Sequence, residues 1–111
     1  MLNSARHTRL LNELTAGRFD LTLVQVEGTS MAPTLMDGET IMIDEGAGAI
    51  GADDIYVLDI YGRRLVKRVR QLYDGTLVLI SDNTAYQRET LPRDVAREVR
   101  VIGRMVWPHS R

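Results

Sequence analysis

Beyond residue 20 the chain is a succession of short runs rich in β-branched and other apolar residues, separated by residues that favour turns. Runs of this length, bounded by Gly, Pro, Asn and Asp, are typical of β-strands. The predicted strands span residues 21–27, 39–44, 55–61, 64–72, 76–81 and 99–107. This pattern predicts a mainly β fold and leaves little room for long helices.

Two tripeptides mark the connections between the middle strands. Tyr61-Gly62-Arg63 and Tyr73-Asp74-Gly75 each contain a glycine, which adopts the positive φ that tight hairpin turns need. The third, fourth and fifth strands are therefore expected to form a meander. Residues 45–52 are mostly small and include three glycines, so we expect a surface loop there.

The first 20 residues differ from the rest. Leu10, Leu11 and Leu14 recur at helical spacing after Ser4, which can cap a helix start, so one short helix ending near Ala16-Gly17 is predicted. With 111 residues and 12.5 kDa, the chain has the length of about one domain. We therefore expect an N-terminal helical appendage or linker remnant at 1–20 and one folded domain at 21–111.

Charge and composition exclude several functions. The net charge of −1 gives no general attraction to nucleic acid or to anionic membranes, so we expect neither to be bound by this chain alone. There is no cysteine, and no apolar run reaches the roughly 18 residues of a membrane span. Neither a signal peptide nor a metal-ligand cluster is recognisable, which predicts a cytoplasmic protein without metal or cofactor.

The basic residues are almost all arginine. Of the 14 Lys and Arg residues, Lys67 is the only lysine. Lysine, unlike arginine, becomes a neutral base when its surroundings are apolar. By the two-residue period of a strand, Lys67 shares a face with Leu65 and Val69, whereas Arg68 projects to the other face. Lys67 is therefore a candidate general base; the alternatives are a lysine snorkelling from a sheet edge and an arginine-biased genome.

A candidate nucleophile lies where the first strand ends. Ser30 follows Gly28 and precedes Pro33, so a strand runs into a glycine turn and then a short proline-bearing segment. A serine on such a turn exposes its hydroxyl near outward-pointing N–H groups, the arrangement that stabilises an acyl-transfer oxyanion. The alternative is that Ser30 only caps a helical turn. A Ser-His-Asp triad has little support, because His7 and His109 lie near opposite ends of the chain.

Four segments together resemble the catalytic domain shared by LexA, phage repressors and UmuD-type proteins. They are Gly28-Thr29-Ser30-Met31-Ala32-Pro33-Thr34-Leu35 with Asp37-Gly38, then Val66-Lys67-Arg68, then Ser81-Asp82-Asn83-Thr84-Ala85-Tyr86, and finally Val101-Ile102-Gly103-Arg104-Met105-Val106-Trp107. The resemblance covers residues 21–107, and the interval between Ser30 and Lys67 matches the family's. It implies a domain of coiled β-sheets and hairpins.

The resemblance also implies a chemistry. Ser30 would be the nucleophile and Lys67 the general base of a Ser/Lys dyad, with the backbone N–H groups of Thr29 and Ser30 forming the oxyanion hole. Relatives cleave their own chain between an N-terminal DNA-binding domain and this domain, stimulated by a RecA filament in the response to DNA damage. The resemblance thus implies an autoproteolytic serine endopeptidase of a transcriptional repressor.

Parts of the family pattern are missing. Residues 1–20 hold no helix-turn-helix module, and Ala16-Gly17 lies closer to Ser30 than the family's scissile bond does. Ala47-Gly48, the second Ala-Gly pair, follows the serine, in the wrong order for the family. A non-catalytic dimerisation and regulatory domain of a repressor is therefore the alternative. A leader peptidase is the third and least favoured interpretation, because it would need a membrane anchor.

Self-association suits either leading interpretation. In the last predicted strand, Val99, Val101, Met105 and Trp107 alternate on one face, with Gly103 among them. A terminal strand of this kind can offer a pairing edge to a second copy, so we expect a homodimer formed through it. The alternative is that these side chains pack into the domain's own core.

Overall fold

The computed structural model describes residues 20–46, 48–51 and 53–108. One antiparallel sheet accounts for most of them. Its strands are β1 (Leu21–Gln25), β2 (Thr40–Asp44), β3 (Asp54–Ile60), β4 (Arg63–Gln71), β5 (Leu77–Ile80), β6 (Glu89–Leu91) and β7 (Arg100–Trp107), and one short helix, α2 (Arg93–Ala96), precedes β7. The mainly β prediction is confirmed; the helix predicted before residue 17 lies outside the described residues.

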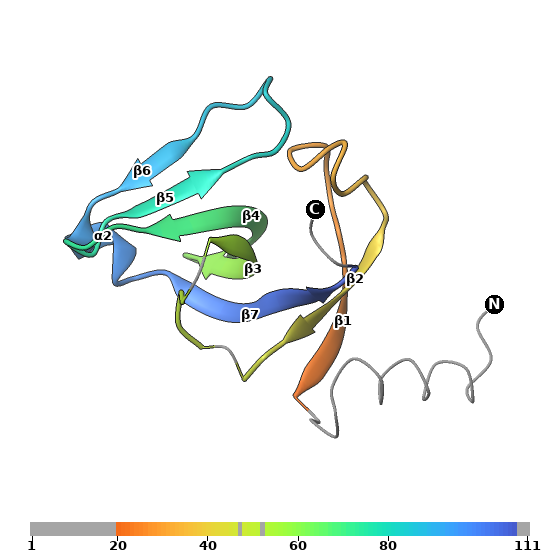
Figure 1. The fold of residues 1–111 in the computed structure, drawn as a ribbon, viewed down its shortest axis with the longest axis horizontal. Coiled ribbons are helices and arrows are strands. Elements are labelled where there is room, and N and C mark those ends of the chain that lie inside the picture. The colour runs from red at the N-terminus through yellow and green to blue at the C-terminus, as the bar shows by residue number, and fades with distance from the viewer. Residues whose placement is uncertain (1–19, 47, 52, 109–111) are drawn as a thin grey trace.

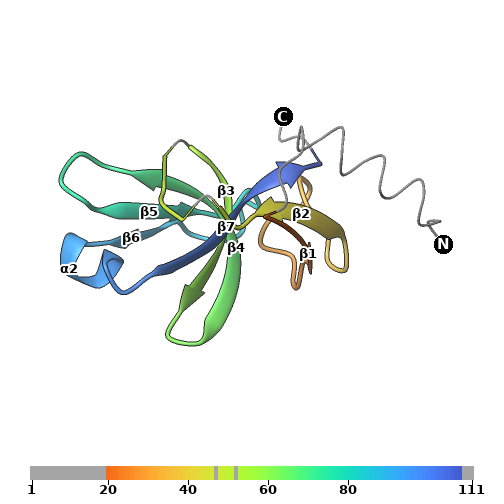
Figure 2. The same cartoon turned by 90° about the horizontal axis from the view of Figure 1, so that it is seen from below.

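The strand order is β1-β2-β7-β3-β4-β5-β6 (Figure 1). Seen from below, the sheet is strongly twisted, and the β1–β2 and β3–β4 hairpins extend in different directions (Figure 2). Irregular pairing between Met42 and Ile43 on β2, and between Val57 and Leu58 on β3, interrupts the ladders on either side of β7. Such bulges increase local twist.

The predicted meander of the middle strands is confirmed. A two-residue turn joins β3 to β4, with Tyr61 at φ 51° and Gly62 at φ 82°, and Asp59 Oδ1 accepts the Gly62 N–H at 2.8 Å. Two positive φ values in sequence match the twist of a hairpin. The meander brings Lys67 opposite Tyr56 of β3.

The role predicted for the last strand is wrong in one respect. β7 lies inside the sheet, paired with β2 through Arg104–Trp107 and with β3 through Arg100–Arg104, so it is not an edge strand. Val99, Val101 and Met105 pack in the core, the alternative that the sequence left open. Gly103 permits this position, because a Cβ there would lie 2.9 Å from the Asp44 carbonyl oxygen on β2.

The sequence also failed to predict β6 and α2. β6 has three residues and α2 four, and neither carries a clear apolar period. Both depend on tertiary contacts: β6 pairs with β5, and Ala96 of α2 packs against Leu77 and Leu79. No helix among the described residues is long and apolar enough to cross a membrane.

Candidate functional site

Ser30 lies in a compact turn between β1 and β2. The turn closes on itself, because Val26 N–H donates to the Glu39 carbonyl and Gly38 N–H donates back to the Val26 carbonyl, both at 2.8 Å. Gly28, at φ 85°, reverses the chain, and its N–H donates to Asp37 Oδ1 at 2.7 Å. We call residues 26–39, which carry the candidate nucleophile Ser30, the nucleophile turn.

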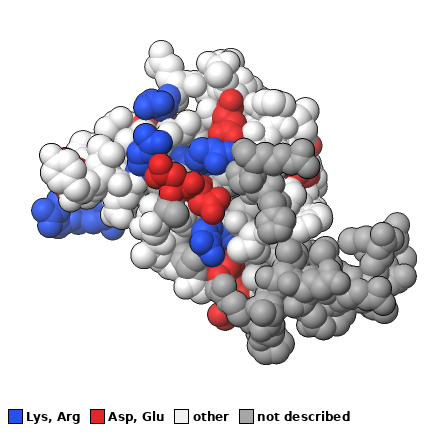
Figure 3. Space-filling model, viewed as in Figure 1, with Lys and Arg blue, Asp and Glu red and all other residues white. Residues whose placement is uncertain are grey.

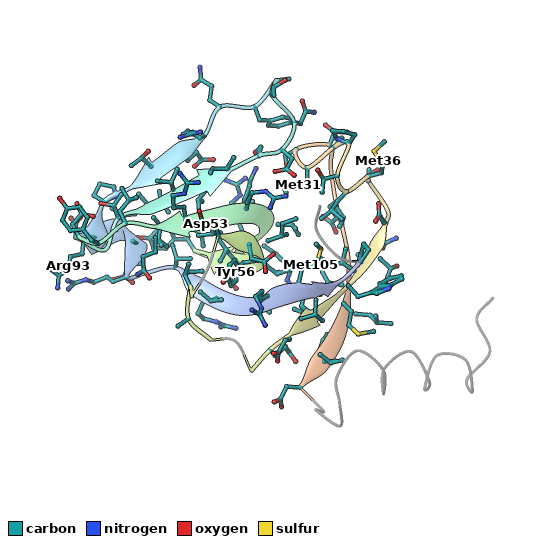
Figure 4. The ribbon with its side chains drawn as sticks, in the orientation of Figure 1. Met31, Met36, Asp53, Tyr56, Arg93 and Met105 are labelled. Atoms are coloured by element: carbon teal, nitrogen blue, oxygen red, sulfur yellow. The ribbon has the colours of Figure 1, made fainter. Side chains whose placement is uncertain are left out.

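Two apolar side chains fix the nucleophile turn to the core. Met31 and Leu35, one helical turn apart, are each 1% exposed and pack with Val24 and Ile41, whereas Met36 is 54% exposed. Figure 4 shows Met31 on the side of the turn that faces the sheet and Met36 on the outer side. The turn that carries Ser30 is therefore anchored to the core by Met31 and Leu35.

The capping alternative for Ser30 is not supported. A helical turn does form, with Leu35 N–H donating to the Met31 carbonyl at 2.9 Å. Within residues 20–46, 48–51 and 53–108, however, no hydrogen bond uses the Ser30 hydroxyl. The described contacts thus contain no capping bond from Ser30.

Lys67 lies in the middle of β4 and is 9% exposed. As predicted, its face is the buried one, since Val69 is fully buried while Arg64 and Arg70 are exposed. β4 pairs with β3 and β5, so Lys67 does not snorkel from a sheet edge. Its Nζ donates to Ser81 Oγ at 2.7 Å and lies 5.7 Å from the centre of the Tyr86 ring.

Ser30 and Lys67 meet at one pocket of about 280 Å³. Its wall comes from the end of β1 and the turn on one side, and from β4 on the other; the lining residues are Leu23, Val24, Gln25, Glu27, Ser30, Arg64, Leu65, Val66 and Lys67. Lys67 Nζ donates to Ser81 Oγ, and the described contacts include no hydrogen bond between Lys67 and Ser30. The pocket is lined by apolar side chains from Leu23, Val24, Leu65 and Val66 and by the polar side chains of Gln25, Glu27 and Arg64.

A third segment, residues 81–86, joins the two halves of the site. Asn83 N–H donates to the Ser30 carbonyl at 3.0 Å, and Asn83 Nδ2 donates to the Thr29 carbonyl at 2.9 Å. The Tyr86 hydroxyl lies 2.9 Å from Thr29 Oγ1. The same segment carries Ser81, so it contacts both the nucleophile turn and the lysine. We call residues 81–86 the bridging segment.

An ion pair anchors the bridging segment to β4. Arg68 donates through Nε and Nη2 to the two carboxylate oxygens of Asp82, each at 2.9 Å, and Thr34 Oγ1 donates to Asp82 Oδ2 at 2.6 Å. The hydrogen bond from Arg68 is the main cause that holds the pKa of the Asp82 carboxyl below its usual range, and the bond from Thr34 adds to it. The partnership also raises the pKa of Arg68.

The surface gives no sign of a polyanion site on the face shown in Figure 3, where acidic and basic side chains intermix over the middle of the molecule. The residues that the structure describes include no group of three or more His, Cys, Asp or Glu that could hold a metal ion.

Sequence reasoning missed the contact between Ser81 and Lys67. The segment from Ser81 to Tyr86 entered only through the family resemblance, which gave no role to Ser81 or Asn83. The register of the β4–β5 hairpin holds the missing signal: Arg68 pairs with Ile80, so the next step of the antiparallel ladder brings Lys67 opposite Ser81. Neither Ala16-Gly17 nor Ala47 falls within the described residues.

Comparison with known proteins finds a matching family and similar proteins. The sequence profile of the family described as peptidase S24-like matches residues 2–106. The chain is similar to the 26 kDa repressor protein of Escherichia phage HK022, at 27% identity over 88 residues, which is 79% of this chain and 37% of that protein. It is also similar to the HTH-type transcriptional regulator PrtR of Pseudomonas aeruginosa, at 36% identity over 86 residues, 75% of this chain and 34% of that protein. The chain thus spans about a third of the length of these relatives.

Proposed function

Since the chain belongs to the peptidase S24-like family, we propose that it is the Ser/Lys peptidase domain of a repressor-type protein and that it cleaves its own polypeptide. The observation that carries this proposal is the shared pocket, into which the turn delivers Ser30 and β4 delivers the buried Lys67. No second general base is needed, because a neutral amine accepts a proton from a serine hydroxyl.

In the proposed mechanism, neutral Lys67 removes the proton of Ser30 Oγ while the oxygen attacks a peptide carbonyl. The N–H groups of Thr29 and Ser30 stabilise the oxyanion. Lys67 then gives its proton to the leaving amine, an acyl ester on Ser30 remains, and water hydrolyses it. Because the base must be neutral, the rate rises with pH.

Ser81 has a positioning role in this mechanism. Its Oγ accepts a hydrogen bond from Lys67 Nζ, so it limits the conformations of a long, flexible side chain. Fixing the amine in the pocket increases the fraction of time in which it can reach Ser30. Ser81 therefore assists without touching the substrate.

The names of the relatives support the wider part of the proposal. A repressor of a phage and an HTH-type regulator each match this chain over about a third of their length. We propose that the domain functions beside an N-terminal DNA-binding domain, that it forms a homodimer, and that a RecA filament stimulates its cleavage. Sedimentation of the 111-residue chain at high micromolar concentration tests dimerisation, and a monomer alone would contradict it.

A second function, a catalytically idle dimerisation and regulatory domain, is favoured by one observation. Lys67 donates to Ser81, and no hydrogen bond joins it to Ser30. If this arrangement persists, the two residues support the fold rather than a reaction.

Incubation at alkaline pH separates the two functions. A form of this chain fused behind a DNA-binding domain and its linker is held at rising pH, and fragments are identified by mass spectrometry. The peptidase proposal predicts two fragments from the unchanged protein and none from Ser30→Ala. Equal fragmentation of both, or of neither, would favour the idle domain.

A further inference from the structure

Asn83 uses all of its polar groups, and two of them hold the nucleophile turn. Its side-chain Nδ2 donates to the Thr29 carbonyl at 2.9 Å and its backbone N–H donates to the Ser30 carbonyl at 3.0 Å. Its Oδ1 accepts the Ala85 N–H at 3.0 Å, and its carbonyl accepts the Tyr86 N–H, also at 3.0 Å. A turn residue needs only the last two bonds.

The first two bonds fix consecutive peptide groups. The peptide bond between Thr29 and Ser30 is trans. In a planar trans peptide the C=O and N–H bonds point in opposite directions. Holding the Thr29 carbonyl at Asn83 therefore directs the Ser30 N–H away from the bridging segment. The Ala32 N–H, 3.1 Å from the same carbonyl, supports this orientation.

The backbone N–H groups of residues 28–30 differ in their hydrogen bonding. The Gly28 N–H is occupied by Asp37, whereas in the described part of the chain no hydrogen bond uses the N–H of Thr29 or Ser30. We propose that Asn83 is a positioning residue that orients the Ser30 N–H toward the oxyanion. This inference rests on the proposed function and assigns a role that its sequence motif alone did not suggest.

The surroundings of Asn83 keep it in place. Asp82, its neighbour, is held by Arg68 on β4 and by Thr34 in the nucleophile turn. The bridging segment thus makes three links to the turn. Asp82 contacts the Thr34 hydroxyl and Tyr86 contacts the Thr29 hydroxyl, both through side chains, whereas Asn83 contacts the peptide groups of residues 29 and 30. This difference provides a matched control.

Asn83→Asp is the informative variant. Aspartate keeps the oxygen that accepts the Ala85 N–H and keeps the backbone N–H, but it replaces the Nδ2 donor with an oxygen that repels the Thr29 carbonyl. Thr34→Val removes the link from Thr34 to Asp82 between the same segments without touching Thr29 or Ser30. Asn83→Ala, which also loses the turn bond, is the second test variant.

Two readouts are measured on the 111-residue chain. Residual dipolar couplings of the Ser30 amide report the direction of its N–H bond whether or not the protein reacts. The second readout is the pH dependence of Ser30 labelling by a fluorophosphonate. In that reaction the Ser30 Oγ–P bond forms, fluoride leaves, the hydroxyl proton passes to Lys67, and negative charge develops on the phosphoryl oxygen.

We expect the Ser30 coupling to change in Asn83→Asp and Asn83→Ala but not in Thr34→Val. Labelling should fall about 10- to 100-fold at every pH in both Asn83 variants, because one oxyanion donor is misdirected. The midpoint of the pH profile should stay unchanged, since Lys67 is untouched. We expect Asn83→Asp to be labelled no faster than Asn83→Ala, although it keeps the oxygen that accepts the Ala85 N–H.

An unchanged Ser30 coupling in Asn83→Asp would overturn the inference. It would also be overturned if Asn83→Asp and Thr34→Val lost the same amount of Ser30 labelling. If the unchanged chain is labelled no faster than Ser30→Ala while the coupling still moves, the proposed function fails and the orientation of the peptide group by Asn83 stands. The two failures are therefore distinguishable.

Discussion

Ser30 and Lys67 reach the same pocket by different structural routes. Lys67 belongs to a regular strand whose backbone pairs with β3 along its length and with β5 over its second half. Ser30 belongs to an irregular turn that is held by side-chain anchors and by the bridging segment. The strand residue is positioned by a repeating ladder, whereas the turn residue is positioned by a few separate contacts.

The two routes also rest on different parts of the core. The nucleophile turn packs on one buried cluster, which includes Val24, Met31, Leu35, Ile41, Ile43 and Ile55. The β3–β5 meander packs on a second cluster, which includes Tyr56, Leu58, Val69, Leu77 and Leu79. The site therefore depends on the relative placement of two clusters, and the bridging segment is the polar link between them.

The largest effect is expected at Leu35. Leu35→Ala removes a side chain that is 1% exposed from beneath the nucleophile turn, so the free energy of unfolding should fall by about 2–5 kcal/mol. Met36→Ala, at the exposed neighbour, should change it by less than about 0.5 kcal/mol. Denaturant unfolding measures both. Equal, small effects would mean that the turn is held by its hydrogen bonds alone.

A smaller effect is expected at Ser81. Ser81→Ala leaves the buried Lys67 Nζ without its hydroxyl partner, so the rate of self-cleavage should fall roughly tenfold, about 1.4 kcal/mol in activation free energy. Ser81→Thr keeps a hydroxyl and should restore most of the rate. Cleavage is followed at alkaline pH in the fused form. If Ser81→Ala cleaves as fast as the unchanged protein, the β4 ladder alone positions the lysine.

The smallest effect is expected at the ion pair of the bridging segment. Arg68 holds the pKa of Asp82 below 3.8, so the pair contributes stability above pH 3.8 and loses it as the pH falls through the lower folded value. Asp82→Asn should cost about 1 kcal/mol near pH 7 and nothing once Asp82 is protonated. Thermal unfolding between pH 2 and pH 7 measures this. A difference that grows on acidification would contradict the assignment.

The same contrast explains what could be predicted from the sequence. All six predicted strands exist, and the buried face of Lys67 followed from a two-residue period that each strand carries in its own residues. The position of β7 inside the sheet was not predictable, because the sequence does not record which strand pairs with which. β6 and α2 are too short to have a pattern.

In the candidate site, too, some features were predictable from local sequence and others depended on the tertiary fold. Ser30 and Lys67 were identified from local patterns and from the family resemblance. The contacts of Ser81 and Asn83 with them cross long intervals of sequence and depend on the hairpin register and on the path of the bridging segment.

The central claim is that Lys67 acts as a base, and Lys67→Arg tests it most directly. In the fused form at alkaline pH, arginine keeps a positive charge but cannot accept the Ser30 proton, because a guanidinium stays protonated. The account predicts that the unchanged protein is cut and that Lys67→Arg loses about 10³-fold or more of the cleavage rate. Equal cleavage rates for the two proteins would contradict it and would make Lys67 a structural residue of a repressor's dimerisation domain.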